Sequence, residues 1–308
     1  MSSNSDCDAI SRCANCGVGE GDGIKLKICT ACKSVKYCGI TCQKQHRPFH
    51  KQECKKRAAE IKDEILFRQT EGNFLGDCPI CFLPMPYGSH KGMLMVCCGK
   101  FICVGCCMAN QMREVEEGKD RKCPFCRQLS PVTYAKSFKM LNERATEKNC
   151  TRAMREVGIT HYNRGEFQTA FKYYSKAAEE GELESHKMLG EMYLNGKGVE
   201  RNLSKALSHT ETAAIGGHPG ARYNLGSIEY RHGQHERAIK HWLISAKAGH
   251  NQSLEDVKQV FKGGLVSKDD FAAALRGHQA AVDATKSLHR EKAAEYLKTA
   301  ACISNINI

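Results

Sequence analysis

Cysteine is the residue type with the greatest capacity for chemistry in this chain. Nineteen cysteines occur in 308 residues, and seventeen of them fall between Cys7 and Cys126. Many form C-x-x-C pairs, a spacing that presents two thiolates to one metal ion. Cysteine-rich chains are either secreted disulfide scaffolds or intracellular metal proteins. The polar start of the sequence lacks the apolar stretch of a signal peptide. The pattern therefore favours reduced thiols that bind zinc in an intracellular protein, cytoplasmic or nuclear.

The first group of potential ligands lies in residues 13–54. It consists of four pairs: Cys13 and Cys16, Cys29 and Cys32, Cys38 and Cys42, His50 and Cys54. Because structural zinc takes four donors in a tetrahedron, four pairs suffice for two ions. His46 is an alternative to His50, but the four-residue helical spacing from His50 to Cys54 favours His50.

The run KYCGITCQKQHRPFHKQEC, residues 36–54, closely resembles a MYND-type zinc finger. The resemblance implies interleaved ligand pairs, with Cys13, Cys16, Cys38 and Cys42 on one zinc and Cys29, Cys32, His50 and Cys54 on the other. MYND fingers typically bind proline-containing peptides, and Arg47 stands where the family usually carries an aromatic residue. No SET-type methyltransferase sequence follows, which excludes that combination here.

The second group lies in residues 78–127, where two C-P-x-C pairs are separated by about forty residues. It resembles a RING-type zinc finger. The resemblance implies one zinc held by Cys78, Cys81, Cys103 and Cys106, and a second held by Cys123 and Cys126 with Cys97 and Cys98. Lys100 replaces the usual histidine and cannot ligate as an ammonium. Because adjacent cysteines are awkward ligands for one metal, His90 or water remains an alternative to one of them.

RING-type ubiquitin ligases do no covalent chemistry themselves but position a charged ubiquitin-conjugating enzyme. The resemblance assigns contacts with that enzyme to Ile80, Pro124 and Arg127. The surplus Cys107 is expected to be a small buried hydrophobe rather than a nucleophile. No catalytic constellation or phosphate-binding glycine loop is evident. The leading hypothesis is a RING-type ubiquitin-protein ligase, and the alternative is a non-catalytic scaffold.

From about Ala135 the sequence becomes almost wholly helical and repeats itself. One apolar position recurs at spacings of 32, 36 and 32 residues, in Val157, Leu189, Leu225 and Val257. The phrases AAEEGE, AAIGGH and SAKAGH close successive units, with a glycine suited to a left-handed helix end. This period predicts a solenoid of helical hairpins. The phrases resemble Sel-one-like repeats, relatives of tetratricopeptide repeats, which implies binding of proteins such as substrates or adaptors.

These observations predict a mainly α chain in which two small zinc-stabilised α+β modules precede an α-hairpin solenoid. Gln52 to Arg68 is expected to form a short charged helix. The expected segments are a polar tail (1–12), a MYND-type finger (13–54), a helical linker (55–77), a RING-type finger (78–127), a linker (128–150), Sel-one-like repeats with a degenerate fourth (151–287), and a C-terminal capping helix and tail (288–308).

The formal net charge of +12 suggests nucleic acid, and Lys55, Lys56 and Arg57 form a basic triplet. If fifteen cysteines bind four zinc ions as thiolates, however, the charge falls to about +5. Nucleic-acid binding is therefore a weaker hypothesis than protein binding. No stretch is long enough for a membrane-spanning helix. About four zinc ions per chain are expected, or three if the Cys97/Cys98 site is defective.

Overall fold

The computed structural model describes residues 12–21, 23–69, 72–88 and 91–306. His90, the alternative ligand, lies outside these ranges, as does Cys7. The chain divides into two compact units, Met1–Arg68 and Gln69–Ile308, and each is described by itself.

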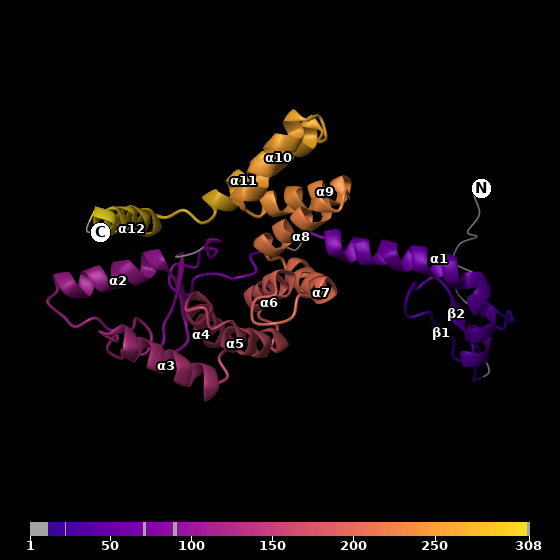
Figure 1. The fold of residues 1–308 in the computed structure, drawn as a ribbon, viewed down its shortest axis with the longest axis horizontal. Coiled ribbons are helices and arrows are strands. Elements are labelled where there is room, and N and C mark those ends of the chain that lie inside the picture. Colours follow the sequence, from indigo (N-terminus) through magenta and orange to yellow (C-terminus); the bar gives the residue numbers. More distant parts are fainter. Residues whose placement is uncertain (1–11, 22, 70–71, 89–90, 307–308) are drawn as a thin grey trace. The chain divides into compact units, whose positions relative to one another are not determined.

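The first unit is built around a two-stranded antiparallel sheet and one long helix (Figure 1). Strand β1 spans Lys27–Ile28, β2 spans Lys36–Tyr37, and α1 spans Ile40–Phe67. The predicted helix from Gln52 is thus only the second half of α1. Ligand spacing explains the early start, because Cys42, His50 and Cys54 occupy helical positions, whereas Leu66 is the one buried residue of α1.

The second unit opens with a small cysteine-rich module. Strands β3 (Gly92–Leu94) and β4 (Phe101–Cys103) pair antiparallel, and α2 (Val104–Glu116) follows directly. Met85 and Ile102 are fully buried among the cysteines. Helix α3 (Tyr134–Thr146) packs on the other side of the hairpin, where Leu141 lies in one apolar cluster with Leu94.

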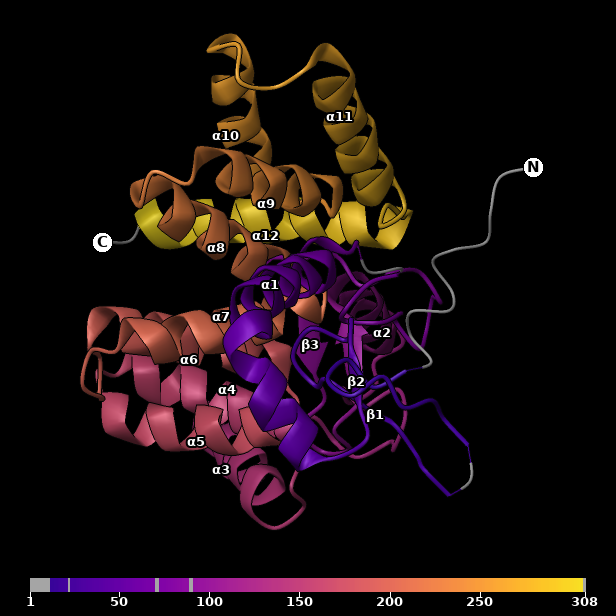
Figure 2. The ribbon, with the colours of Figure 1, turned by 90° about the vertical axis from the view of Figure 1, so that its right-hand side faces the viewer.

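A stack of antiparallel helical hairpins forms most of the second unit (Figures 1 and 2). Its helices are α4 (Thr151–Asn163), α5 (Phe167–Glu179), α6 (Leu183–Asn195), α7 (Leu203–Ile215), α8 (Pro219–Arg231), α9 (His235–Lys247), α10 (Asn251–Lys262) and α11 (Lys268–Asp283). The predicted recurrent apolar residues are almost fully buried: Val157, Leu189, Leu225 and Val257. The predicted mainly α fold with a solenoid is confirmed.

Two kinds of glycine account for the repeated phrases. One kind permits close helix packing: a Cβ on Gly158 would lie 2.7 Å from the Tyr174 ring, and a Cβ on Gly226 would lie 2.6 Å from Trp242 Nε1. The other kind ends the second helix of a hairpin with positive φ values of 82°, 90° and 86°, at Gly181, Gly217 and Gly249.

The residue after each of these terminal glycines caps the next helix. Glu182 accepts a hydrogen bond from the Ser185 amide at the start of α6. At the starts of α8 and α10 the caps are His218 and His250, whose Nδ1 atoms each accept a backbone N–H at 3.1 Å. The phrase G-E or G-H therefore ends one hairpin and begins the next.

Helix α12 (Leu288–Ile306) packs against α2 of the cysteine-rich module (Figure 1). This differs from the predicted role of the segment 288–308 as a cap on the repeats. At that end of the stack, α11 packs against both α9 and α10. The position of α12 follows from its buried Arg290, which contacts Gly105, Pro84 and Cys81 of the module.

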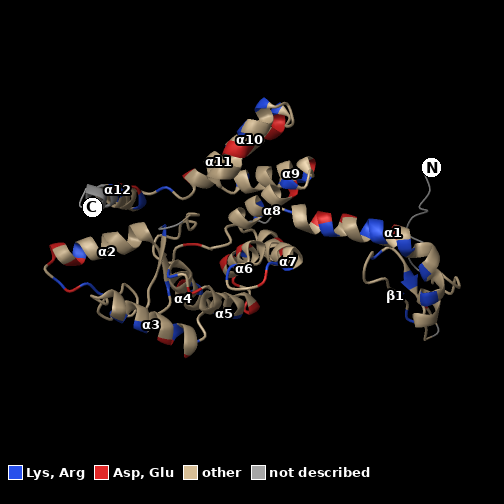
Figure 3. Ribbon diagram, in the orientation of Figure 1, with Lys and Arg blue, Asp and Glu red and all other residues tan. Residues whose placement is uncertain are grey.

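Charges of both signs are interspersed along the helices (Figure 3). The basic triplet on α1 follows this pattern, since Arg57 pairs with both Glu60 and Glu64 at 3.0 Å. Within the described part of the chain, no helix combines the length and the apolar character needed to cross a membrane.

Candidate metal centres

Four groups of side chains in the described residues place four potential ligand atoms each within 4.8 Å of one another. We name each group by its first residue. The Cys13 cluster contains Cys13, Cys16, Cys38 and Cys42; the Cys29 cluster contains Cys29, Cys32, His50 and Cys54; the Cys78 cluster contains Cys78, Cys81, Cys103 and Cys106; the Cys97 cluster contains Cys97, Cys98, Cys123 and Cys126. The structure thus brings together the same sets that the sequence suggested, and the role of each residue as a ligand stays a prediction.

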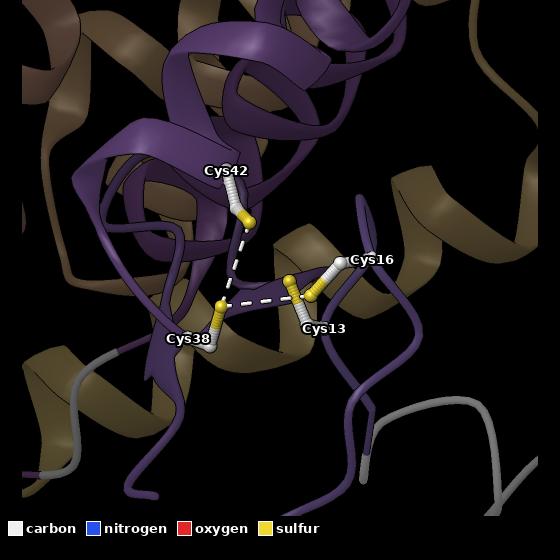
Figure 4. Close-up of side chains that lie close together, drawn as sticks. All are labelled: Cys13, Cys16, Cys38 and Cys42. Atoms are coloured by element: carbon white, nitrogen blue, oxygen red, sulfur yellow. Dashed lines mark hydrogen bonds between the residues drawn. The ribbon is translucent and has the colours of Figure 1, made fainter.

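The Cys13 cluster joins a loop to the start of α1 (Figure 4). Its Sγ atoms lie 3.6 Å apart between Cys16 and Cys38 and 3.5 Å apart between Cys38 and Cys42. Zinc–sulfur bonds of about 2.3 Å in a tetrahedron place sulfurs about 3.8 Å apart. Disulfide bonding would require about 2.05 Å, and the cysteines here are free. The spacing fits a zinc ion.

The Cys29 cluster includes the histidine that helical spacing favoured. Cys29 Sγ lies 3.8 Å from Cys54 Sγ, and Cys32 Sγ lies 3.2 Å from His50 Nε2. His46, the competing candidate, instead has its Nδ1 3.1 Å from the Tyr37 hydroxyl. Its ring also stacks on that of His50, with centroids 5.6 Å apart. His46 thus contacts the His50 ring and Tyr37, and it is not one of the four clustered residues.

Four C-x-x-C pairs, those that begin at Cys13, Cys29, Cys78 and Cys123, fold into the same tight turn, which we call a knuckle. The residue after the second cysteine has a positive φ and donates its N–H to the carbonyl of the first cysteine; these residues are Gly17, Lys33, Phe82 and Arg127. The N–H of the first cysteine in turn donates to a carbonyl five or six residues later. The knuckle fixes both sulfurs on one side of the turn, as a tetrahedral site requires.

The knuckle also favours the thiolate form of its first cysteine. Burial raises the pKa of Cys13, but backbone N–H groups, including that of Cys16, lower it more, to about 6. The same two opposing causes bring the pKa of Cys29 to about 6 and that of Cys78 to about 7. For Cys123 the shift is also downward. Thiolates are the zinc-binding form, so this chemistry fits the metal.

The Cys78 and Cys97 clusters interleave along the chain. The Cys78 cluster combines Cys78 and Cys81 with Cys103 and Cys106. In the Cys97 cluster, Cys97 and Cys98 precede Cys103, and Cys123 and Cys126 follow Cys106. The Sγ atoms of Cys81 and Cys103 lie 3.9 Å apart. With a metal ion in each, two clusters that alternate in this way would cross-link residues 78–126, where the apolar core is small.

The Cys97 cluster shows how two adjacent cysteines reach one site. The loop after β3 bends as a knuckle does: the Met95 N–H donates to the Lys100 carbonyl, and Gly99 has a positive φ of 75°. Cys98 then occupies the second-cysteine position, and its Sγ lies 3.6 Å from that of Cys123. Lys100 contributes its backbone carbonyl to this turn and is exposed to solvent. The awkwardness expected of adjacent cysteines is thus relieved by the bend of the loop.

An arginine from outside the module holds that loop in place. Arg144 of α3 donates from Nε to the Val96 carbonyl at 2.9 Å and from Nη2 to the Cys97 carbonyl. A Cβ on Gly99 would lie 3.0 Å from Arg144 Nη1, so glycine also makes room for the guanidinium. Nothing in the local sequence pattern pointed to Arg144, because the contact spans 47 residues.

Cys107 is buried, and burial raises the pKa of its thiol to about 11. It belongs to the apolar core of the second module. A protonated, buried thiol is a poor nucleophile. The expectation that Cys107 packs as a small hydrophobe agrees with this environment.

The three residues proposed to contact a conjugating enzyme all lie on the two knuckles of the second module. Ile80 is 37 % exposed, Arg127 is exposed and Pro124 is partly buried. Phe82 and Phe125, beside the same knuckles, add apolar surface with exposed fractions of 78 % and 36 %. Helix α12 packs on the module without burying these knuckle residues.

Comparison with family models identifies two of the three regions. Residues 13–54 match the MYND finger, and residues 151–182, 183–218 and 219–250 match three Sel1 repeats. The chain therefore contains a MYND zinc finger and Sel1 repeats, and its clusters fit multiple zinc ions.

Individual relatives cover short parts of the chain. Chitin synthase regulatory factor 4 of Schizosaccharomyces pombe is 34 % identical over 84 residues, which are 27 % of this chain and 13 % of that protein. SET domain and MYND-type zinc finger protein 6 of the same yeast is 37 % identical over 59 residues, 19 % of this chain and 12 % of that protein. A solved Sel1 repeat protein from Oxalobacter formigenes is 26 % identical, with a TM-score of 0.42, over 49 % of this chain and 65 % of its own. The chain thus spans about an eighth of the length of the two yeast relatives.

Proposed function

We propose that this protein-interaction chain acts as a RING-type ubiquitin-protein ligase. In this proposal the second module recruits a ubiquitin-conjugating enzyme, while the MYND finger and the Sel1 repeats bind substrates or adaptors. The observation that carries the proposal is the interleaving of the Cys78 and Cys97 clusters, because this cross-brace is the ligand order that a RING finger requires. The chemistry belongs to the conjugating enzyme, so no nucleophile of this chain is needed.

Zinc would serve as a structural ion in all four clusters. Each would receive four protein ligands, which leaves no open position for water or substrate. The knuckles would hold Ile80 and Arg127 at fixed positions, since both residues belong to turns whose ends are tied by backbone hydrogen bonds. A conjugating enzyme would meet apolar side chains flanked by a cation, a combination typical of protein-binding surfaces.

An autoubiquitination assay with several conjugating enzymes tests the proposal. The full-length chain is expected to form ubiquitin chains with at least one of them, and Ile80→Ala and Arg127→Ala are expected to reduce the rate at least about tenfold. Matched controls are Val132→Ala, which removes an 87 % exposed apolar side chain outside the module, and Arg121→Ala, which removes an exposed cation. Zinc content is measured for each variant, so that a loss of activity is separated from a loss of fold.

A non-catalytic scaffold is the second candidate. It is favoured by the fact that the MYND and Sel1 matches account for protein binding without any ligase activity. Absence of ubiquitin chains with every conjugating enzyme tried, in protein that retains its zinc, would establish this alternative. Phe49 on α1, which is 84 % exposed, is a candidate contact for partner peptides near the Arg47 position.

A further inference from the structure

Helix α12 approaches the second module closely at Gly105. Gly105 lies in the first turn of α2 and is buried. A Cβ at this position would lie 2.7 Å from the backbone N of Arg290 and 2.8 Å from its Cα. Since backbone atoms cannot move aside as a flexible side chain can, the two helices can touch here only because residue 105 is glycine.

This contact places the Arg290 guanidinium beside the Cys78 cluster. Arg290 is 8 % exposed. Its Nη1 donates to the carbonyls of Pro84 and Thr285, both at 2.8 Å. Its Nη2 lies 3.3 Å from the Leu83 carbonyl and 3.3 Å from Cys81 Sγ. The side chain thus binds the end of the first knuckle and one of its sulfurs at once.

The positive charge of Arg290 can stabilise a negatively charged zinc–thiolate cluster. Four thiolates around one Zn²⁺ carry a net charge of −2, which is costly in a buried site unless a nearby cation offsets it. Arginine remains protonated at all ordinary pH values and offers several N–H donors in a fixed plane. Within the described residues, Arg290 interacts with three carbonyls and with the sulfurs of Cys81 and Cys103, and none of these partners is a carboxylate. Its charge is therefore available to the cluster.

We propose that Arg290 is a positioning residue of the Cys78 cluster, which holds the Cys81 thiolate from outside the ligand set. Zinc binding in this cluster and docking of α12 then favour each other, because the guanidinium binds the metal-loaded, negatively charged cluster better than the empty one. Such coupling is reciprocal: whatever α12 adds to the retention of zinc, zinc adds to the retention of α12. The inference rests on zinc occupying this cluster, and it is independent of ligase activity.

Zinc release from the full-length, zinc-loaded chain tests the first half of the proposal. Excess chelator and a metallochromic dye report the release of each ion. Arg290→Met, which keeps an unbranched apolar stem but removes the charged guanidinium, is expected to accelerate the release of one ion about 10- to 100-fold and to leave the others unchanged. Arg290→Lys is expected to restore part of the difference. Lys292→Met on the exposed face of the same helix is the matched control and is expected to release zinc as the wild type does.

Hydrogen exchange tests the second half. In Cys81→Ser, amides of residues 288–299 are expected to lose protection, whereas Cys16→Ser, in a cluster of the first unit, is expected to leave them protected. Wild-type release kinetics in Arg290→Met, or a protected α12 in Cys81→Ser, would overturn the coupling. Zinc content is measured first. A chain with no zinc in the Cys78 cluster would overturn the proposal at its premise, and absence of ubiquitin chains in the ligase assay would not affect it.

Discussion

The two cysteine-rich modules both have small apolar cores, but they differ in which parts of the chain stabilise them. Each has two four-ligand clusters, a two-stranded sheet and a small apolar core. In the first module, every clustered residue and the helix that carries three of them lie within residues 13–67. In the second, two arginines from α3 and α12 contact the loops that carry the cysteines. Zinc can therefore suffice for one module, whereas the other depends on parts of the chain far away in sequence.

The largest test of this difference is a single added methyl group. Gly105→Ala would drive a Cβ into the backbone of Arg290 and is expected to destabilise the docked α12 by about 3 kcal/mol. Gly19→Ala in the first module is the matched control, because its Cβ would meet nothing within 4 Å. Hydrogen exchange of residues 288–299 measures the effect. Equal protection in both variants would mean that the second module does not rely on this contact.

Arg144 provides the next test, on the opposite side of the same module. Arg144→Met leaves the carbonyls of Val96 and Cys97 without their donor, at an expected cost of about 2 kcal/mol to the loop of the Cys97 cluster. Faster chelator-driven loss of one zinc ion is the expected readout. Lys136→Met, an exposed substitution on the same helix, serves as the control. Unchanged zinc release from Arg144→Met would show that the Cys97 cluster does not depend on α3.

A pH dependence should also separate the two regions, because the second unit contains histidine caps. Burial and the charges of His218, Lys187 and His278 lower the pKa of His250 to about 4, from about 6.5 in an unfolded chain. The neutral ring is the form that accepts the Ser253 N–H. Its contribution is therefore complete above pH 6.5 and is lost as the pH falls toward 4.

His250→Asn keeps a neutral cap at every pH. The wild type is expected to lose on the order of 1–2 kcal/mol more than this variant between pH 7.5 and 4.5 in the opening of α10, followed by hydrogen exchange of residues 251–262. Identical pH profiles for the two proteins would exclude His250 as the source.

The smallest expected effect concerns a knuckle of the first module. Lys33 has a φ of 58°, a conformation that favours glycine, and its residue is exposed. Lys33→Gly is expected to stabilise the first unit by about 0.5 kcal/mol, because glycine adopts a positive φ without steric strain. The greater conformational entropy of glycine in the unfolded chain offsets part of this gain. Denaturant unfolding of the zinc-loaded chain, followed by a probe in residues 13–54, measures it. A loss of stability would show that the lysine side chain matters more than its backbone.

Local spacing made much of the molecule predictable. The knuckles follow from cysteines three residues apart, and the solenoid follows from a repeat of 32 to 36 residues. The four clusters of potential ligands also agree with the sets suggested by the sequence. The start of α1 was missed because its cause is the placement of ligands rather than an apolar stripe. The positions of Arg144 and α12 could not be inferred, because they result from packing between distant segments. Even Gly105, which meets the backbone of Arg290, gives no sign in the sequence of which segment packs on it.

The distance along the chain between Cys81 and Arg290 has a consequence for the newly made protein. Arg290 is the 209th residue that the ribosome adds after Cys81. At about 5–20 residues per second, the delay is on the order of 10–40 s. A nascent Cys78 cluster would therefore spend this interval without Arg290. The two clusters of the first module would by then have all of their cysteine and histidine residues. Zinc capture during translation is expected to proceed in two stages, with the second module completed only when the last helix is made.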